Sequence, residues 1–65
     1  MMRIPLNEGA IDSNVPHTPG AYQLIAGNMV IYVGRSDEDL NSRLKDHLPY
    51  RETNPYIRGQ RPRFR

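Results

Sequence analysis

Two short apolar runs separated by Gly27-Asn28 constrain the fold of this chain more than any other feature of its sequence. The runs, residues 21–26 (AYQLIA) and 29–33 (MVIYV), are rich in the aliphatic and aromatic residues that favour strands. Glycine and asparagine tolerate the positive φ angles that a two-residue hairpin turn requires. The sequence therefore predicts an antiparallel β-hairpin over residues 21–33.

The register of this hairpin decides where its two tyrosines point. With a plain two-residue turn, Tyr22 and Tyr32 lie on opposite faces of the hairpin, because side chains alternate along a strand. A single bulge, or a loop of odd length, pairs Tyr22 with Tyr32 and puts both phenols on one face. We expect this second arrangement, since it is the one in which the two tyrosines can act together.

A polar helix is predicted after the hairpin, over about residues 37–48. Ser36 is suited to cap it, the three carboxylates that follow suit the positive end of a helix, and Pro49 ends it. At about 100° per residue, Arg43 and His47 lie one turn apart at the edge of the apolar stripe. That stripe repeats every four residues and consists of Leu40, Leu44 and Leu48.

The remaining segments carry weaker signals. Residues 1–18 have no sustained apolar period and are predicted to form an extended N-terminal arm. Residues 49–60 are predicted to be a loop with at most one turn of helix. Residues 61–65 (RPRFR) are predicted to start a short third strand, which Pro62 confines to a sheet edge or to a strand start. The expected fold class is α+β, with one domain over residues 19–65.

Composition limits the class of protein. A chain of 65 residues forms one small domain with a thin core, and the absence of cysteine excludes disulfides and thiolate zinc sites. No apolar run approaches the length of about 18 residues typical of a membrane span, so we expect a cytoplasmic protein with no membrane partner. Residues 50–65 contain five arginines and one glutamate. This excess of positive charge is typical either of a phosphate-backbone binder or of a solvated tail.

Four side chains suggest a chemistry. Tyr22, Tyr32, Arg43 and His47 would serve one anionic site if the hairpin and the helix meet as predicted. A phenol can orient or deprotonate an attacking water, an arginine can neutralise charge on a phosphate in the transition state, and a histidine can relay the proton. The combination favours hydrolysis of a phosphodiester, for which a divalent metal usually stabilises the leaving oxygen.

These residues resemble the GIY-YIG nuclease superfamily. Gly20-Ala21-Tyr22 corresponds to the first motif of that family and Tyr32-Val33-Gly34 to the second, and Pro19 before the first motif also fits. The pattern Leu40-x-x-Arg43-Leu44-x-x-His47-Leu48 is similar to the first helix of the family. The similarity covers residues 19–48 well and residues 49–65 loosely.

The resemblance implies roles for these residues. Tyr22 would activate water, Tyr32 would hydrogen-bond into the same site, Arg43 would stabilise the scissile phosphate and His47 would assist proton transfer. Members of the family bind Mg²⁺ or Mn²⁺ through a glutamate on a helix after the third strand, and this chain has no glutamate at that place. We therefore expect an incomplete site, completed by further sequence, by a second chain or by a homodimer that extends the sheet. DNA is the expected partner, and its backbone would contact Arg35, Arg58, Arg61 and Arg63.

Each of these assignments has a plainer alternative. The tyrosines also suit a sheet face, Arg43 also suits an ion pair on the helix surface, and His47 also suits the negative end of a helix. Two other functions therefore remain open beside a metal-dependent endonuclease. One is a non-catalytic nucleic-acid-binding module that uses the basic C-terminal stripe. The other is a structural fragment whose exposed third strand pairs with a partner.

Overall fold

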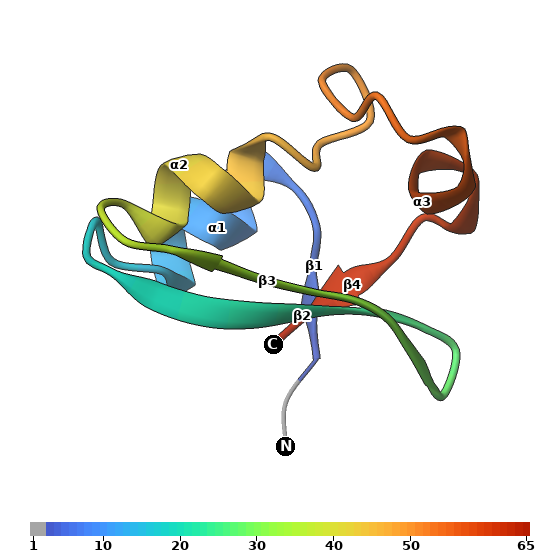
Figure 1. Cartoon of the computed structure of the whole chain (residues 1–65), viewed down its shortest axis with the longest axis horizontal. Coiled ribbons are helices and arrows are strands. Elements are labelled where there is room, and N and C mark those ends of the chain that lie inside the picture. Colours follow the sequence, from blue (N-terminus) through green and yellow to red (C-terminus); the bar gives the residue numbers. More distant parts are fainter. Residues whose placement is uncertain (1–2) are drawn as a thin grey trace.

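The computed structural model describes residues 3–65 of the chain. Within these residues lie four strands and three short helices (Figure 1). In chain order the elements are β1 (Ile4–Pro5), α1 (Glu8–Asn14), β2 (Gly20–Ala26), β3 (Met29–Ser36), α2 (Leu40–Lys45), α3 (Pro55–Gln60) and β4 (Arg63–Phe64).

The strands of the described part form one antiparallel sheet in the order β1-β4-β2-β3. Strands β2 and β3 pair along their whole length and turn at Gly27-Asn28, where Gly27 adopts a positive φ of 62°. Strand β4 joins the hairpin through the pair Leu24–Phe64, and β1 joins β4 through the pair Ile4–Phe64. The predicted α+β class and the predicted hairpin are thereby confirmed.

The third strand is also confirmed, but it does not lie at the sheet edge. Strand β4 pairs with β1 on one side and with β2 on the other. Pro62 directly precedes the strand, so its missing N–H interrupts no ladder hydrogen bond. The hypothesis that an exposed third strand recruits a partner is therefore wrong for β4, because both of its edges are occupied.

The prediction of an extended arm over residues 1–18 is wrong for the residues that the structure describes. This segment contains β1 and the two-turn helix α1. The side chain of Asn7 caps α1 by accepting a hydrogen bond from the backbone N–H of Ala10. Ile11 is fully buried in the core. One buried residue anchors so short a helix, which explains why the sequence shows no helical period there.

Helix α2 is shorter than the helix predicted over residues 37–48. Asp39, and not Ser36, is the N-cap, because its carboxylate accepts a hydrogen bond from the backbone N–H of Ser42. The Ser36 hydroxyl instead accepts from the two N–H groups that precede the helix and closes a separate turn. After α2 the chain continues as far as Leu48 in tighter turns, closed by hydrogen bonds between residues three apart.

Residues 49–60 contain more helix than the single turn expected. Asn54 caps α3 by accepting a hydrogen bond from the backbone N–H of Tyr56, and Pro55 occupies the first helical turn. Proline suits that position because its fixed φ is helical and its missing N–H has no partner there in any case. Ile57 is the residue of α3 that reaches the core.

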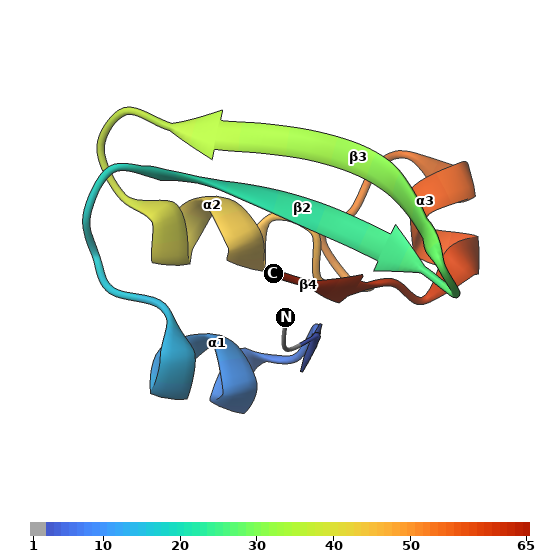
Figure 2. The same ribbon diagram turned by 90° about the horizontal axis from the view of Figure 1, so that it is seen from below.

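One hydrophobic core lies between the sheet and the helices. Figure 1 shows the helices on one side of the β2–β3 hairpin, and Figure 2 shows the same ribbon from below. The outer parts of the core are partly buried side chains, among them Leu40 and Tyr32. None of the helices in the part of the chain that the structure describes is long and apolar enough to cross a membrane. The buried cluster consists of Ile11, Val15, Tyr22, Leu24, Leu44, Leu48, Ile57 and Phe64.

Candidate active site

The two tyrosines of the hairpin lie on the face of the sheet that carries the helices. A register shift between Leu24 and Ile25 displaces β2 against β3. As a result, Tyr22 lies opposite Gly34 and Tyr32 lies opposite Leu24. The direct pairing of Tyr22 with Tyr32 that we expected is therefore wrong. The expectation of a shared face is correct, because the two ring centroids are 6.2 Å apart.

Glycine at position 34 leaves room for the Tyr22 ring. The phenol lies over Gly34 so closely that a Cβ atom at this position would overlap the ring and the hydroxyl of Tyr22. The φ angle of Gly34 is not positive, so the requirement is for space and not for an unusual backbone conformation. Any side chain at position 34 would push the phenol away from β3.

A chain of buried hydrogen bonds starts at this phenol. The Tyr22 hydroxyl lies 2.6 Å from Nε2 of His47, and Nδ1 of His47 lies 2.6 Å from Oε1 of Glu52. The three side chains are 2%, 9% and 8% exposed, so water screens these contacts very little. The second carboxylate oxygen of Glu52 accepts a hydrogen bond of 3.1 Å from the backbone N–H of Asn54. Each carboxylate oxygen of Glu52 thus has a hydrogen-bond partner within the protein.

The environment shifts the protonation equilibria of both ends of this chain. Burial, together with the nearby Tyr32 phenol, raises the pKa of Tyr22 to about 12, although the guanidinium of Arg43 acts in the opposite direction. Burial also favours the neutral form of Glu52, but the hydrogen bonds from His47 and from the backbone of Asn54 outweigh it and lower the pKa of that carboxyl group. At neutral pH the phenol keeps its proton and the carboxylate is ionised.

Three different parts of the fold supply these three residues. Tyr22 comes from β2, His47 from the tight turn after α2, and Glu52 from the loop before α3. The Tyr32 ring closes the site from β3, with its centroid 5.0 Å from that of the His47 ring. The Tyr22 and His47 rings meet edge to face, with centroids 5.4 Å apart. Packing of Leu44 and Leu48 around the turn fixes the position of the imidazole.

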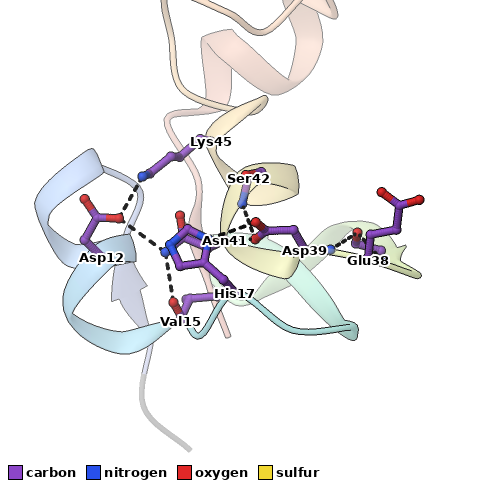
Figure 3. A network of polar contacts seen from close by, with 9 residues as sticks. Asp12, Val15, His17, Glu38, Asp39, Asn41, Ser42 and Lys45 are labelled. Carbon is purple, nitrogen blue, oxygen red and sulfur yellow. Dashed lines mark hydrogen bonds and ion pairs between the residues drawn. The ribbon is translucent and has the colours of Figure 1, made fainter.

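A polar network on the far side of α2 holds that helix in place (Figure 3). The buried side chain of Asn41 donates to the backbone carbonyl of Val15 at 2.9 Å and to the carboxylate of Asp12 at 3.2 Å. Lys45 forms an ion pair of 2.7 Å with the same carboxylate, and this contact lowers the pKa of Asp12. Helices α1 and α2 are therefore joined by side-chain contacts just ahead of the turn that carries His47.

Arg43 reaches the phenol from the exposed side of α2. The contact with Tyr22 raises the pKa of Arg43, which is otherwise open to solvent. The guanidinium also lines a shallow hollow of about 330 Å³ whose wall includes the carboxylates of Asp39 and Asp46. Arg43 therefore lies next to the phenol, as the sequence predicted. The carboxylates of Asp39 and Asp46 line the same hollow and supply negative charge close to its guanidinium.

Arg35 does not join this group. It lies opposite Ala21 in the hairpin, one residue away from the pair formed by Tyr22 and Gly34. Because side chains alternate along a strand, Arg35 lies on the other face of the sheet. There it is exposed and forms an ion pair with Asp37.

The predicted nucleic-acid-binding arginines near the C-terminus border a separate groove. Arg58, Arg61 and Arg63 line a groove of about 680 Å³ together with apolar side chains of β1 and the α2–α3 connection. His47 also lines this groove, so its imidazole lies between the Tyr22 phenol and the basic groove. Among residues 3–65, none of these three guanidiniums forms an ion pair with a carboxylate. The three guanidiniums that line this groove can therefore bind an anion.

The metal that the resemblance implies finds no ligand set in this part of the chain. Among the described residues, no three carboxylate or histidine side chains are grouped so that they hold a metal ion. Glu52 is the carboxylate that the hydrogen-bond chain links to Tyr22. One of its oxygens contacts His47 and the other accepts the N–H of Asn54. The donors present around Tyr22 therefore do not fit a divalent metal by themselves.

Glu52 is the residue that sequence reasoning missed. The sequence gives Glu52 no role, because it does not stand at the place where the family carries its metal-binding glutamate. Its proximity to His47 in the sequence is the one signal that pointed to a contact, since a turn at Pro49 can fold the chain back over five residues. The backbone carbonyl of Glu52 also accepts a hydrogen bond of 3.5 Å from Arg58 of α3, a helix that the sequence predicted only as a loop with at most one turn.

We compared the chain with models of known protein families, with curated proteins and with solved structures, and no significant match was found.

Proposed function

We propose that this chain forms the tyrosine, arginine and histidine part of a GIY-YIG-type endonuclease site that hydrolyses a DNA phosphodiester with the help of a divalent metal. The observation that carries the proposal is the hydrogen bond of 2.6 Å between the Tyr22 hydroxyl and His47, with Tyr32 and Arg43 adjacent to it. These are the four side chains that the motif resemblance selects, and they come from β2, β3, α2 and the turn after it.

In this proposal each side chain has one task. Tyr22 receives a proton from the attacking water after passing its own proton to His47. Arg43 neutralises charge on the phosphate, for which a guanidinium beside a phenol is well placed. Tyr32 holds the ring of His47 in position through its aromatic contact. A bound Mg²⁺ or Mn²⁺ would stabilise the leaving oxygen, and its carboxylate ligand would come from another chain or from sequence beyond these 65 residues.

The test is nicking of supercoiled plasmid DNA in the presence of Mg²⁺ or Mn²⁺. Arg43→Ala should reduce nicking by at least about 10²-fold, since it removes the charge that faces the developing phosphate charge. Arg51→Ala is the matched control, because Arg51 carries the same charge nearby and forms an exposed ion pair with Asp46. Equal losses in both variants would contradict the proposal, and so would the absence of nicking with either metal once the chain is supplied with the partner or the further sequence that carries the missing carboxylate.

The alternative is a non-catalytic nucleic-acid-binding module, and the basic groove beside His47 favours it. Binding through Arg58, Arg61 and Arg63 would be steeply salt-dependent and would need no metal. Arg63→Gln should lower the slope of log K against log salt by about one, whereas Arg51→Gln should leave the slope unchanged. Metal-independent binding without nicking would favour this alternative over the endonuclease.

A further inference from the structure

We propose that Glu52 is a positioning residue that fixes which nitrogen of His47 carries the proton, and thereby makes the Tyr22 hydroxyl the donor to His47. Where activity is concerned, this inference rests on the proposed function, because it assigns the direction in which a proton leaves Tyr22. The direction of the hydrogen bonds is nevertheless a property of this chain and is measurable without DNA or metal.

The first step is the chemistry of the carboxylate. Glu52 is ionised at neutral pH, because hydrogen bonds hold its pKa below the usual range, and an ionised carboxylate can only accept hydrogen bonds. The atom that faces its Oε1 at 2.6 Å is Nδ1 of His47, which must therefore carry a proton. In a neutral imidazole the other nitrogen, Nε2, then has a free lone pair. The Tyr22 hydroxyl, 2.6 Å away, is left as the donor.

The second step is the orientation of Glu52 itself. Its Oε2 accepts the backbone N–H of Asn54, and its Oε1 is thereby directed at His47. This arrangement predicts what an amide at this position would do. In Glu52→Gln, the oxygen must face the N–H of Asn54, so the NH₂ group must face Nδ1 of His47. That nitrogen would have to become an acceptor, and the ring proton would move to Nε2, facing the Tyr22 oxygen.

The third step is the proton movement that the wild-type arrangement permits. The O–H bond of Tyr22 breaks, a bond between that proton and Nε2 of His47 forms, and the Nδ1 proton remains in its hydrogen bond to Glu52. The products are a phenolate, an imidazolium and a carboxylate, so net charge is conserved. Arg43 faces the phenolate oxygen and stabilises its charge. In this arrangement His47 is the base, Glu52 orients it, and the Tyr22 phenol is the group that loses its proton.

The groove lined by Arg58, Arg61 and Arg63 gives the His47 ring a route for a proton to reach water. His47 lines the groove of Arg58, Arg61 and Arg63 on one side and contacts the Tyr22 phenol on the other. An imidazolium formed by the proton transfer can therefore return its proton to water through the groove. Tyr22 itself is 2% exposed.

The experiment is nitrogen-15 NMR of the two histidines in the labelled chain, at a pH high enough for both rings to be neutral. In the wild-type chain we expect His47 as the Nδ1–H tautomer, and in Glu52→Gln we expect the Nε2–H tautomer. His17 is an internal reference, because it lies on the surface and contacts Asp39. Glu38→Gln is the matched control, since Glu38 is exposed and its side chain should leave the His47 tautomer unchanged.

The wild-type spectrum alone can overturn the inference, even where the variant does not fold. An Nε2–H tautomer, or an imidazolium that persists at high pH, would mean that Tyr22 is the acceptor. A Glu52→Gln chain that keeps the Nδ1–H tautomer would equally contradict it. As a second variant, Tyr22→Phe should move the Nε2 resonance toward that of a nitrogen without a hydrogen bond, while Nδ1 keeps its proton. An unchanged Nε2 resonance would contradict the contact.

Activity gives an independent readout. If the chain nicks DNA, Glu52→Gln should lower kcat by about 10²-fold or more with little change in KM, because it removes proton transfer and not DNA binding. Nicking that survives the tautomer change would overturn the proton route from Tyr22. A tautomer change in a chain that never nicks DNA would support the positioning role of Glu52, which needs neither DNA nor metal, and would show that these 65 residues alone do not form the complete nuclease site.

Discussion

Residues 3–65 contain two histidine–carboxylate pairs, one buried and one on the surface. His47 and Glu52 are 9% and 8% exposed and meet at 2.6 Å. His17 and Asp39 are 63% and 36% exposed and meet at 2.8 Å on the surface (Figure 3). The buried imidazole has a second partner, Tyr22, at its other nitrogen. The structure gives His17 contacts through Nδ1 alone among the described residues.

The difference shows that burial, and not residue type, decides what such a pair does. Water competes for every hydrogen bond of the exposed pair and screens its charge, so the contact contributes little. In the buried pair each nitrogen has one fixed partner, and the direction of both hydrogen bonds is determined together. Asp39 has a different task, because it caps α2 through the backbone N–H of Ser42.

The largest effect should come from removing the buried carboxylate. Glu52→Ala should lower the free energy of unfolding by about 3 kcal/mol or more, because it leaves Nδ1 of His47 buried without a partner and removes the acceptor of the Asn54 N–H. Asp39→Ala should cost about 1 kcal/mol, the usual cost of losing an N-cap. Urea denaturation followed by circular dichroism measures both values. Equal losses would contradict the contrast between the two pairs.

A smaller effect should appear at alkaline pH, where the buried phenol must ionise. The pKa of Tyr22 is raised from 10.0 to about 12, so its contribution to stability is complete below pH 10 and is lost as the pH rises through 12. The loss in that interval should be about 2 to 3 kcal/mol. Tyr22→Phe should lack this component, whereas Tyr50→Phe, at a position 74% exposed, should retain it. Identical alkaline profiles for Tyr22→Phe and the wild-type chain would contradict the burial of the phenol.

The smallest effect belongs to the exposed histidine. His17→Ala should change the free energy of unfolding by less than about 1 kcal/mol, because an ion pair open to solvent contributes little. That small change should shrink further in molar salt, where charges on the surface are screened. Thermal unfolding at low and high salt gives the comparison. A loss as large as that of Glu52→Ala would show that surface position does not weaken this pair.

Much of the fold was predictable because its strongest signals are local. The Gly27-Asn28 turn, the apolar runs beside it and the leucines of α2 each act over a few residues. Helix α1 was not predictable in the same way, because Ile11 is held by packing against distant elements and not by a pattern. The interior place of β4 depends on pairing with β1, and the two residues of β1 are too few for the sequence to predict which strand they join.

The sequence predicted which four side chains gather at the candidate site, but it did not predict the hydrogen bonds between them. Tyr22, Tyr32, Arg43 and His47 do gather, because hairpin alternation and helical spacing bring them to one side of the sheet. The bulge that sets the tyrosine register, and the turn that carries Glu52 to His47, depend on tertiary contacts. Arg35 lies on the opposite face for the same reason that Tyr22 lies on this one, since adjacent strand positions alternate.

The pairing of Ile4 with Phe64 has a consequence for how this chain folds during translation. The two residues stand at almost opposite ends of the sequence, so their contact closes one of the longest loops that these 65 residues allow. Long-range contacts of this kind slow folding, because the entropy cost of closing a loop rises with the logarithm of its length and is incurred before the contact stabilises the chain. A nascent chain that has not yet reached residue 64 can form the β2–β3 hairpin, but its first strand has no neighbour to join.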